Sequence, residues 1–516
     1  MSEGVGVGYD ETMRVRLQAL IDHPDSFTPS YRDRYRFLIE HCDGIDAHAT
    51  YAITQLLGRD ASRGFTELPA EPDLRFPAEH APDLGYQMGW HFIVGTARAT
   101  DGTEYGVQFM PFTSAVLPAD VRNAFGLSEI ENQVMETHLA ISRRDDRHYR
   151  GAPVVVDGRS GEIEVRASPF LYRAGETVME SSDPTGELIP LHIRGRAWDR
   201  SGPDPIELKV DFTFTHAKPP FLQGNDGAAP SLAGVGTLYY SIPYMTLGGE
   251  RNTLRIGADE IEIESGEFWM DHQWGTGLVT CNIFAGNPRS AALRAATLLA
   301  PPSPGGWDWF MAMFDGDHQL TLATLHSTDD PAHYDQSGPT APTPMTIPVF
   351  GARVDPAGVR HRVTGSLLVD DWVRAERSPH PDVYPVTGVW YPDRWTFTLD
   401  GDVPDVMRTF TMTPIVEGGQ AGFFAPGVQY SEGAVILTDV DGNGIGHGFA
   451  ESVGYHLSFA PSVMSVAGLP VTPESVALFD RSKPSPKLRI QAMLHLLRPS
   501  ARRELRRWSE ALTLKP

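Results

Sequence analysis

The chain has very few cysteines and no long apolar segment. Of its 516 residues only Cys42 and Cys281 are cysteines, and their wide separation gives no Cys-x-x-Cys pair. A disulfide framework and a cysteine-rich zinc site are therefore excluded, and we expect reduced thiols. No run of 18 apolar residues occurs, and the N-terminus MSEGVGVGYDETMRVRL lacks the pattern of a secretory signal. These absences predict a cytoplasmic protein without a membrane-spanning helix.

Basic residues are scarce over most of the chain. The formal net charge is −23 at pH 7, which argues against nucleic acid as a partner, because a polyanion requires a basic surface. Residues 481–516 differ, since they contain ten Lys or Arg and only two acidic residues. We expect this tail to form helices that pack back on the acidic body and cover the apolar residues Leu488, Ile490, Met493, Leu494 and Leu497. The alternative is a peripheral membrane contact through the same segment.

The motifs of common enzyme classes are also missing. The chain contains no Gly-x-Ser-x-Gly, no His-Glu-x-x-His, no phosphate-binding loop and no zinc-ligand spacing. Residues 439–451 begin like a calcium-binding loop, but the twelfth position is Ala450 instead of glutamate. We interpret that segment as a hairpin turn. The sequence therefore predicts neither a metal nor an organic cofactor.

Glycine and proline, in contrast, are abundant. The 50 glycines and 42 prolines suit many short strands joined by turns. From about residue 85 the apolar pattern has a period of two, as in ELKVDFTF (207–214), where every second residue is apolar. This pattern predicts a mainly β fold of antiparallel barrels or sandwiches in two β-rich halves. Helical spacing is expected only near the two ends, at 10–22, 30–42, 487–497 and 501–512.

One segment, GEFWMDHQWGTG at 266–277, combines an acid, an imidazole and two indoles. In a strand, Trp269 and Asp271 would lie on one face, and Met270 and His272 on the other. Two interpretations follow. The rings and the polar pair are structural, because indoles bury large areas and need only one hydrogen-bond partner. Alternatively, Trp269 and Asp271 face a common site.

The segment belongs to an ordered set of short motifs across about 85–460. They are WHF, EYGVQFMPF, THLAIS, HAKPPFLQGNDG, LYYSIPYMTLGG, GEFWMDHQWG, GGWDWFMAMF and GHGFAESVGY. In this set the chain resembles the AttH-like/carotenoid 1,2-hydratase superfamily, to which kievitone hydratases and fungal lipocalin-like Diels–Alderases are distantly related. The resemblance implies two antiparallel lipocalin-like β-barrels side by side, with WMDHQWG near their junction. The expected parts are a helical N-terminal extension, two β-domains and a basic helical tail, at 1–84, 85–285, 286–465 and 466–516.

Hydration of an unactivated alkene, which the resemblance implies, needs an acid that stays protonated and surroundings that tolerate a cation. A carboxyl in an apolar pocket keeps its proton because desolvation raises its pKa, and aromatic faces stabilise cations. We therefore predict Asp271 as the proton donor and His272 or His91 as the group that orients water. The residues predicted to bind substrate are Trp269, Trp274, Trp307, Trp309 and Tyr240.

The predicted function is thus a cofactor-free lyase of the hydratase type that acts on an isoprenoid or another large apolar substrate. Two other classes stay open. The first is a pericyclase or cyclase of secondary metabolism, in which a shaped apolar cavity and one or two hydrogen-bond donors lower the barrier. The second is a non-catalytic carrier of lipophilic ligands, because lipocalin-like barrels suit ligand storage.

Overall fold

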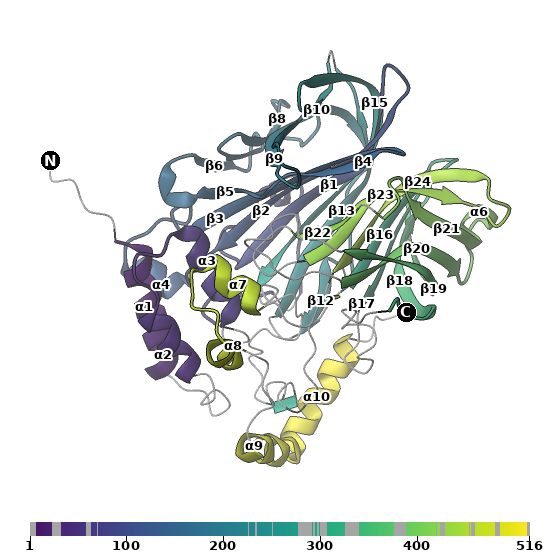
Figure 1. The fold of residues 1–516 in the computed structure, drawn as a ribbon. Coiled ribbons are helices and arrows are strands. Elements are labelled where there is room, and N and C mark those ends of the chain that lie inside the picture. The colour runs from purple at the N-terminus through teal and green to yellow at the C-terminus, as the bar shows by residue number, and fades with distance from the viewer. Residues whose placement is uncertain are drawn as a thin grey trace.

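The computed structural model of the protein is mainly antiparallel β-structure, with helices near both ends of the chain (Figure 1). The predicted mainly β, antiparallel fold class is therefore confirmed, as one closed eight-stranded barrel and one larger antiparallel sheet where two barrels were expected. The structure describes residues 7–22, 32–57, 63–69, 71–224, 226–232, 235–249, 251–276, 292, 295–296, 299, 307–325, 340–375, 389–418, 420–423, 429–453, 455, 460–479 and 486–512.

The first sheet is built from strands between Met88 and Thr276. In hydrogen-bonded order they are β4 (Arg147–Arg150), β3 (Gln133–Arg143), β2 (Glu104–Ala115), β1 (Met88–Ala99), β15 (Asp259–Thr276), β13 (Val235–Leu247), β10 (Ile206–Ala217), β9 (Leu191–Asp199), β8 (Thr177–Ser181), β7 (Leu171–Ala174) and β6 (Ile163–Arg166). Four shorter strands join them: β5 (Val154–Asp157) pairs with β3, β11 (Phe221–Leu222) and β12 (Ala228–Leu232) pair with β13, and β14 (Thr253–Ile256) pairs with β10 and β15.

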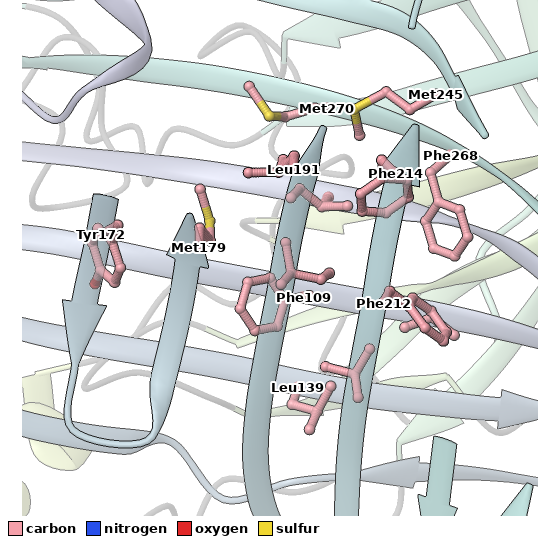
Figure 2. Close-up of a cluster of buried hydrophobic side chains, with 14 of the residues drawn as sticks. Phe109, Leu139, Tyr172, Met179, Leu191, Phe212, Phe214, Met245, Phe268 and Met270 are labelled. Atoms are coloured by element: carbon pink, nitrogen blue, oxygen red, sulfur yellow. The ribbon is translucent and has the colours of Figure 1, made fainter. Parts of the chain in front are cut away.

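This sheet surrounds one apolar core, to which strands from both ends of the sheet contribute (Figure 2). The alternation predicted for 207–214 explains the contribution of β10, because its apolar residues Leu208, Val210, Phe212 and Phe214 are all buried there. Phe109 of β2 and Phe268 of β15 lie in the same core. Burial of so many aromatic and aliphatic side chains provides the main free energy that stabilises the sheet.

The second sheet closes into a barrel of eight antiparallel strands. They are β16 (Trp307–Phe314), β17 (His318–Leu325), β18 (Met345–Val354), β19 (Arg360–Ala375), β20 (Val389–Leu399), β21 (Thr409–Pro414), β23 (Gln429–Thr438) and β24 (Gly444–Val453). Closure results from pairing of β21 with β23 and of β24 with β16, while the short β22 (Ala421–Phe423) pairs only with β23. Phe310, Trp395 and Phe397 lie in the barrel interior.

The two sheets pack against each other through a layer of buried apolar side chains that we call the junction. Its larger members are Phe92, Met110, Trp269, Trp309, Met311 and Phe449. The sheets approach each other closely between β2 and β23, where a Cβ added at Gly106 would lie 2.4 Å from the Cβ of Ala434. Only glycine fits this position without displacing one sheet from the other.

Helices from both ends of the chain share a separate core. The expected N-terminal helices are present as α1 (Tyr9–Asp22) and α2 (Arg32–Glu40), followed by the unexpected α3 (Ala47–Leu56). They pack against α7 (Ala460–Val466) and α8 (Pro473–Phe479), two short helices that the sequence pattern did not predict. The expectation that helices occur only near the ends is also wrong for α4 (Ala119–Ala124) and α6 (Asp405–Arg408). Each of these two has at most six residues, too short for a helical period to be visible.

The basic tail forms the two expected helices, α9 (Pro486–Leu496) and α10 (Pro499–Leu512). The prediction that its apolar residues are covered is wrong for Ile490, Met493, Leu494 and Leu497, which are all exposed. The side chain of Leu488 lies outside the described part, as does Cys281, whereas Cys42 is buried as a free thiol. Among the described helices none has the length and hydropathy needed to cross a membrane.

Candidate active site at the junction of the two sheets

Gly266–Thr276 of the GEFWMDHQWGTG segment form the second half of β15, near the centre of the first sheet. It pairs with β1 on one side, where Phe92 lies opposite Asp271, and with β13 on the other, where Ser241 lies opposite Asp271. Because side chains alternate along a strand, Trp269 and Asp271 face the junction. Met270 faces the core of the first sheet.

The carboxyl of Asp271 is buried and accepts three hydrogen bonds. Ser241 donates its hydroxyl and Trp269 its indole N–H to Oδ1, at 2.5 and 2.6 Å, and Tyr239 donates its hydroxyl to Oδ2 at 2.5 Å. Burial raises the pKa of Asp271 from 3.8 to about 7, although the three donors oppose this shift by stabilising the carboxylate. The group can therefore hold or release a proton near neutral pH.

Residues of both sheets surround this carboxyl. Trp309 of β16 donates its indole N–H to the hydroxyl of Tyr239 at 3.1 Å. Its ring packs edge-on against Trp269 and Phe92, with centroids 6.3 and 5.2 Å apart. Phe221 also packs edge-on against Trp269, with centroids 5.8 Å apart. The acid is thus enclosed by aromatic rings and held by hydroxyl and indole donors.

A second titratable carboxyl, Glu451 of β24, faces the same region from the second sheet. Trp307 donates its indole N–H to Glu451 at 3.3 Å. Burial, together with the nearby carboxyls of Asp271 and Asp308, raises the pKa of Glu451 to about 7. Glu432, which lies opposite Glu451 in the β23–β24 pairing, also has a raised pKa, because it is buried and close to Glu451. Glu451 therefore lies within electrostatic reach of both Asp271 and Glu432.

Four of the predicted site residues lie elsewhere. His91, His272, Trp274 and Tyr240 belong to a cluster on the opposite face of β1, β13 and β15. His272 stacks between His91 and Trp274, with centroids 3.8 and 4.4 Å away. Because β15 separates the two faces, the structure does not bring these four residues together with Asp271.

The histidine cluster is closed by η3 (Ala78–His80), from the proline-rich stretch that precedes β1. The backbone carbonyls of Glu79 and His80 contact His272 Nδ1 and His91 Nε2, and His80 Nδ1 lies 2.7 Å from the hydroxyl of Tyr240. Burial lowers the pKa of His80 to about 3 and of His91 to about 4, and it lowers that of His272 as well. These rings are neutral at pH 7. Within the described part of the chain, no three His, Cys, Asp or Glu side chains are grouped to hold a metal ion.

The remaining predicted residues, Trp269, Trp307 and Trp309, do lie at the junction with Asp271. The polar partners Tyr239, Ser241, Glu451 and Glu432 were missed. Tyr239 and Ser241 belong to the motif LYYSIPYMTLGG, and Glu451 belongs to GHGFAESVGY. Three of the four therefore lie in motifs that the sequence analysis had already singled out. The signal that could have selected them is strand alternation, because Tyr239 and Ser241 share a face and Tyr240 lies on the other.

Comparison with known proteins gives one matching family and several matching solved structures. A family model described as AttH-like matches residues 67–344. A crystal structure of an AttH from Nitrosomonas europaea is 19% identical with a TM-score of 0.50, over 76% of this chain and 100% of that chain. Kievitone hydratase from Nectria haematococca is 14% identical with a TM-score of 0.44, over 77% and 97%. No curated protein matches the chain.

Proposed function

The chain belongs to the AttH-like family, and we propose that it is a cofactor-free lyase of the hydratase type that protonates a carbon–carbon double bond of a large apolar, isoprenoid-like substrate. The observation that carries the proposal is the Asp271 carboxyl, which has a pKa of about 7 and is surrounded by indole rings. A carboxylic acid that keeps its proton near pH 7 is the group that alkene protonation requires.

In the first step, the π electrons of the alkene take the proton of Asp271 and form a new C–H bond. Asp271 becomes a carboxylate, and the adjacent carbon becomes a cation. The hydroxyls of Tyr239 and Ser241 and the indole N–H of Trp269 then stabilise the carboxylate as hydrogen-bond donors. The aromatic rings of the junction stabilise the cation, by about 0.5–2 kcal/mol for each ring in contact.

In the second step, water attacks the cation and loses one proton. We propose Glu451 as the base that accepts this proton, because its carboxyl lies in the same region and its pKa of about 7 suits proton transfer at neutral pH. The sum of the two steps is addition of water across the double bond. Return of the Glu451 proton to Asp271 through solvent restores the starting state.

The test is turnover of a panel of isoprenoid alkenes in D₂O and in ¹⁸O-labelled water, followed by mass spectrometry. A hydrated product should carry one deuterium on carbon and one ¹⁸O. Asp271→Asn should lower the rate by at least about a hundredfold, as expected for loss of a general acid. The matched control is Asp199→Asn at the end of β9, which removes a buried carboxyl held by Ser201 and Arg147 rather than by the Tyr239, Ser241 and Trp269 set.

Two results would contradict the proposal. Full activity of Asp271→Asn would remove the acid from the mechanism. A product that is isomeric with the substrate and free of solvent deuterium would instead support a cyclase. Unfolding temperatures of both variants distinguish loss of the acid from loss of the fold.

A further inference from the structure

Helix α9 presents a stripe of apolar side chains to solvent. Ile490, Met493, Leu494 and Leu497 are 52, 49, 60 and 60% exposed. They are four of the nine large hydrophobic side chains that are exposed in the described part of the chain. Their spacing of three, one and three residues places them on one side of the helix.

The opposite side of α9 is attached to the protein. Ala492 is buried against Ala295, with Leu496 partly buried beside them. The next helix, α10, contacts β12, and its Ala501 is buried. Figure 1 shows α9 at the lower edge of the molecule, away from both sheets. The packing of Ala492 and Leu496 therefore fixes the orientation of α9, so that the stripe points outward.

Basic side chains flank the stripe. Between residues 486 and 506 six Lys or Arg are exposed and the only acidic residue is Glu504, although the chain as a whole carries a net charge of −23. The six are Lys487, Arg489, Arg498, Arg502, Arg503 and Arg506. A helix with an apolar stripe and adjacent cations is suited to an interface where hydrocarbon and anionic groups lie side by side.

We propose that α9 and α10 dock the protein on the surface of a membrane that contains anionic lipids. The four apolar side chains enter the boundary between headgroups and acyl chains, and the basic side chains contact lipid phosphates. A second copy of the chain fits the patch less well. A symmetric dimer would bring two basic patches together, and four half-exposed side chains fall short of the roughly 800 Å² per partner that a stable dimer buries.

The experiment is co-sedimentation of the full-length protein with vesicles of phosphatidylcholine, alone or mixed with phosphatidylglycerol. We expect binding to the mixed vesicles, weakened by added salt. Met493→Ser combined with Leu494→Ser should lower the partition coefficient by at least roughly tenfold, because it removes apolar area from the bilayer. Arg502→Gln combined with Arg503→Gln should lower it by roughly fivefold per charge on mixed vesicles only.

The matched control is Val440→Ser, which removes a side chain that is 75% exposed in the turn after β23. It should bind vesicles as the unchanged protein does. The proposal is overturned if the unchanged protein fails to bind mixed vesicles, or if the α9 variant binds equally well while its unfolding temperature shows that it is folded. It is also overturned if light scattering shows a dimer that the α9 variant abolishes, since a second copy then covers the stripe.

Discussion

Trp309 of the second sheet donates its indole N–H to the hydroxyl of Tyr239 in the first sheet, and this hydroxyl in turn donates a hydrogen bond to the carboxyl of Asp271. The candidate acid is therefore connected to both sheets by one chain of hydrogen bonds. Its pKa depends on how the sheets sit against each other, because both desolvation and donor geometry change with that packing.

Tyr239→Phe should raise the pKa of Asp271 above its value of about 7. The substitution removes one of the donors that stabilise the carboxylate, while the burial that raises the pKa is retained. The proton donor then stays protonated to higher pH. The pH at which kcat/KM begins to decline should therefore be higher than in the unchanged protein. Tyr240→Phe is the control, because Tyr240 lies on the other face of β13 and should leave this part of the profile unchanged.

Asp271 should also make the protein less stable as pH rises from about 4 to about 7. Its pKa is raised in the folded state, so the folded protein binds more protons than the unfolded chain between these values. The stabilisation that this group contributes is complete below pH 4. It falls by about 1.4 kcal/mol per pH unit between pH 4 and pH 7, and it is lost above pH 7. Asp271→Asn should abolish this dependence.

The buried histidines change the unfolding free energy with pH in the opposite direction, over much of the same pH range. Because the folded-state pKa values of His80 and His91 are lowered to about 3 and 4, these residues reduce stability as pH falls below about 6.5. The measurement is therefore the difference in unfolding free energy between the unchanged protein and Asp271→Asn, by urea titration from pH 4 to pH 8. A difference that does not vary with pH would contradict the raised pKa.

His272→Ala should reduce stability much more than turnover. His272 is buried in a stack with His91 and Trp274, so truncation leaves a cavity that should cost about 2–5 kcal/mol. The ring lies across the strand from Asp271 and does not contact its carboxyl. Urea unfolding together with turnover below the new unfolding midpoint tests this. A rate loss as large as that of Asp271→Asn would restore His272 as a catalytic residue.

The arrangement within β15 could be predicted because it is local. Alternation along one strand is enough to place Trp269 beside Asp271 and Met270 on the opposite face. The same alternation shows why His272 and Asp271 cannot share a site, although both were predicted to act on substrate. The alternation already placed His272 on the other face, so assigning it to the same site as Asp271 conflicted with the period of two that the strand imposes.

The partners of Asp271 could not be predicted in the same way, because they come from other strands. Ser241 and Tyr239 reach the carboxyl through the register of β13 on β15, and Glu451 through packing of the second sheet. Register and sheet packing depend on contacts between residues far apart in sequence. The apolar periodicity of one segment carries no information about such contacts. Helices α7 and α8 were missed for a related reason, since each has seven residues and is stabilised by the N-terminal helices.

Gly106→Ala should destabilise the junction by about 1–3 kcal/mol, because the new methyl group would overlap Ala434. Ala434→Gly should recover most of that loss in the double variant, and a double-mutant cycle measures the coupling. Gly444→Ala is the control, since a Cβ there meets no atom within 4 Å. Equal losses in the single and double variants would show that the contact between the sheets is not the cause.

Glu451→Gln should separate protonation of the substrate from capture of water. The amide oxygen can still accept the indole N–H of Trp307, so the local structure should be retained, but the side chain can no longer accept a proton from water. Asp271 still forms the cation, which then returns a proton from a neighbouring carbon to the Asp271 carboxylate and becomes an alkene isomer. We expect hydration to fall by roughly a hundredfold. Alkene that carries solvent deuterium should accumulate, as measured by mass spectrometry in D₂O. Glu267→Gln is the control, because the Glu267 carboxylate accepts from Tyr244 at 2.6 Å and lies 3.4 Å from His447 Nε2, whereas that of Glu451 accepts from Trp307. Unchanged hydration in Glu451→Gln would assign the base to another group, with Glu432, its neighbour across the β23–β24 pairing, as the next residue to substitute.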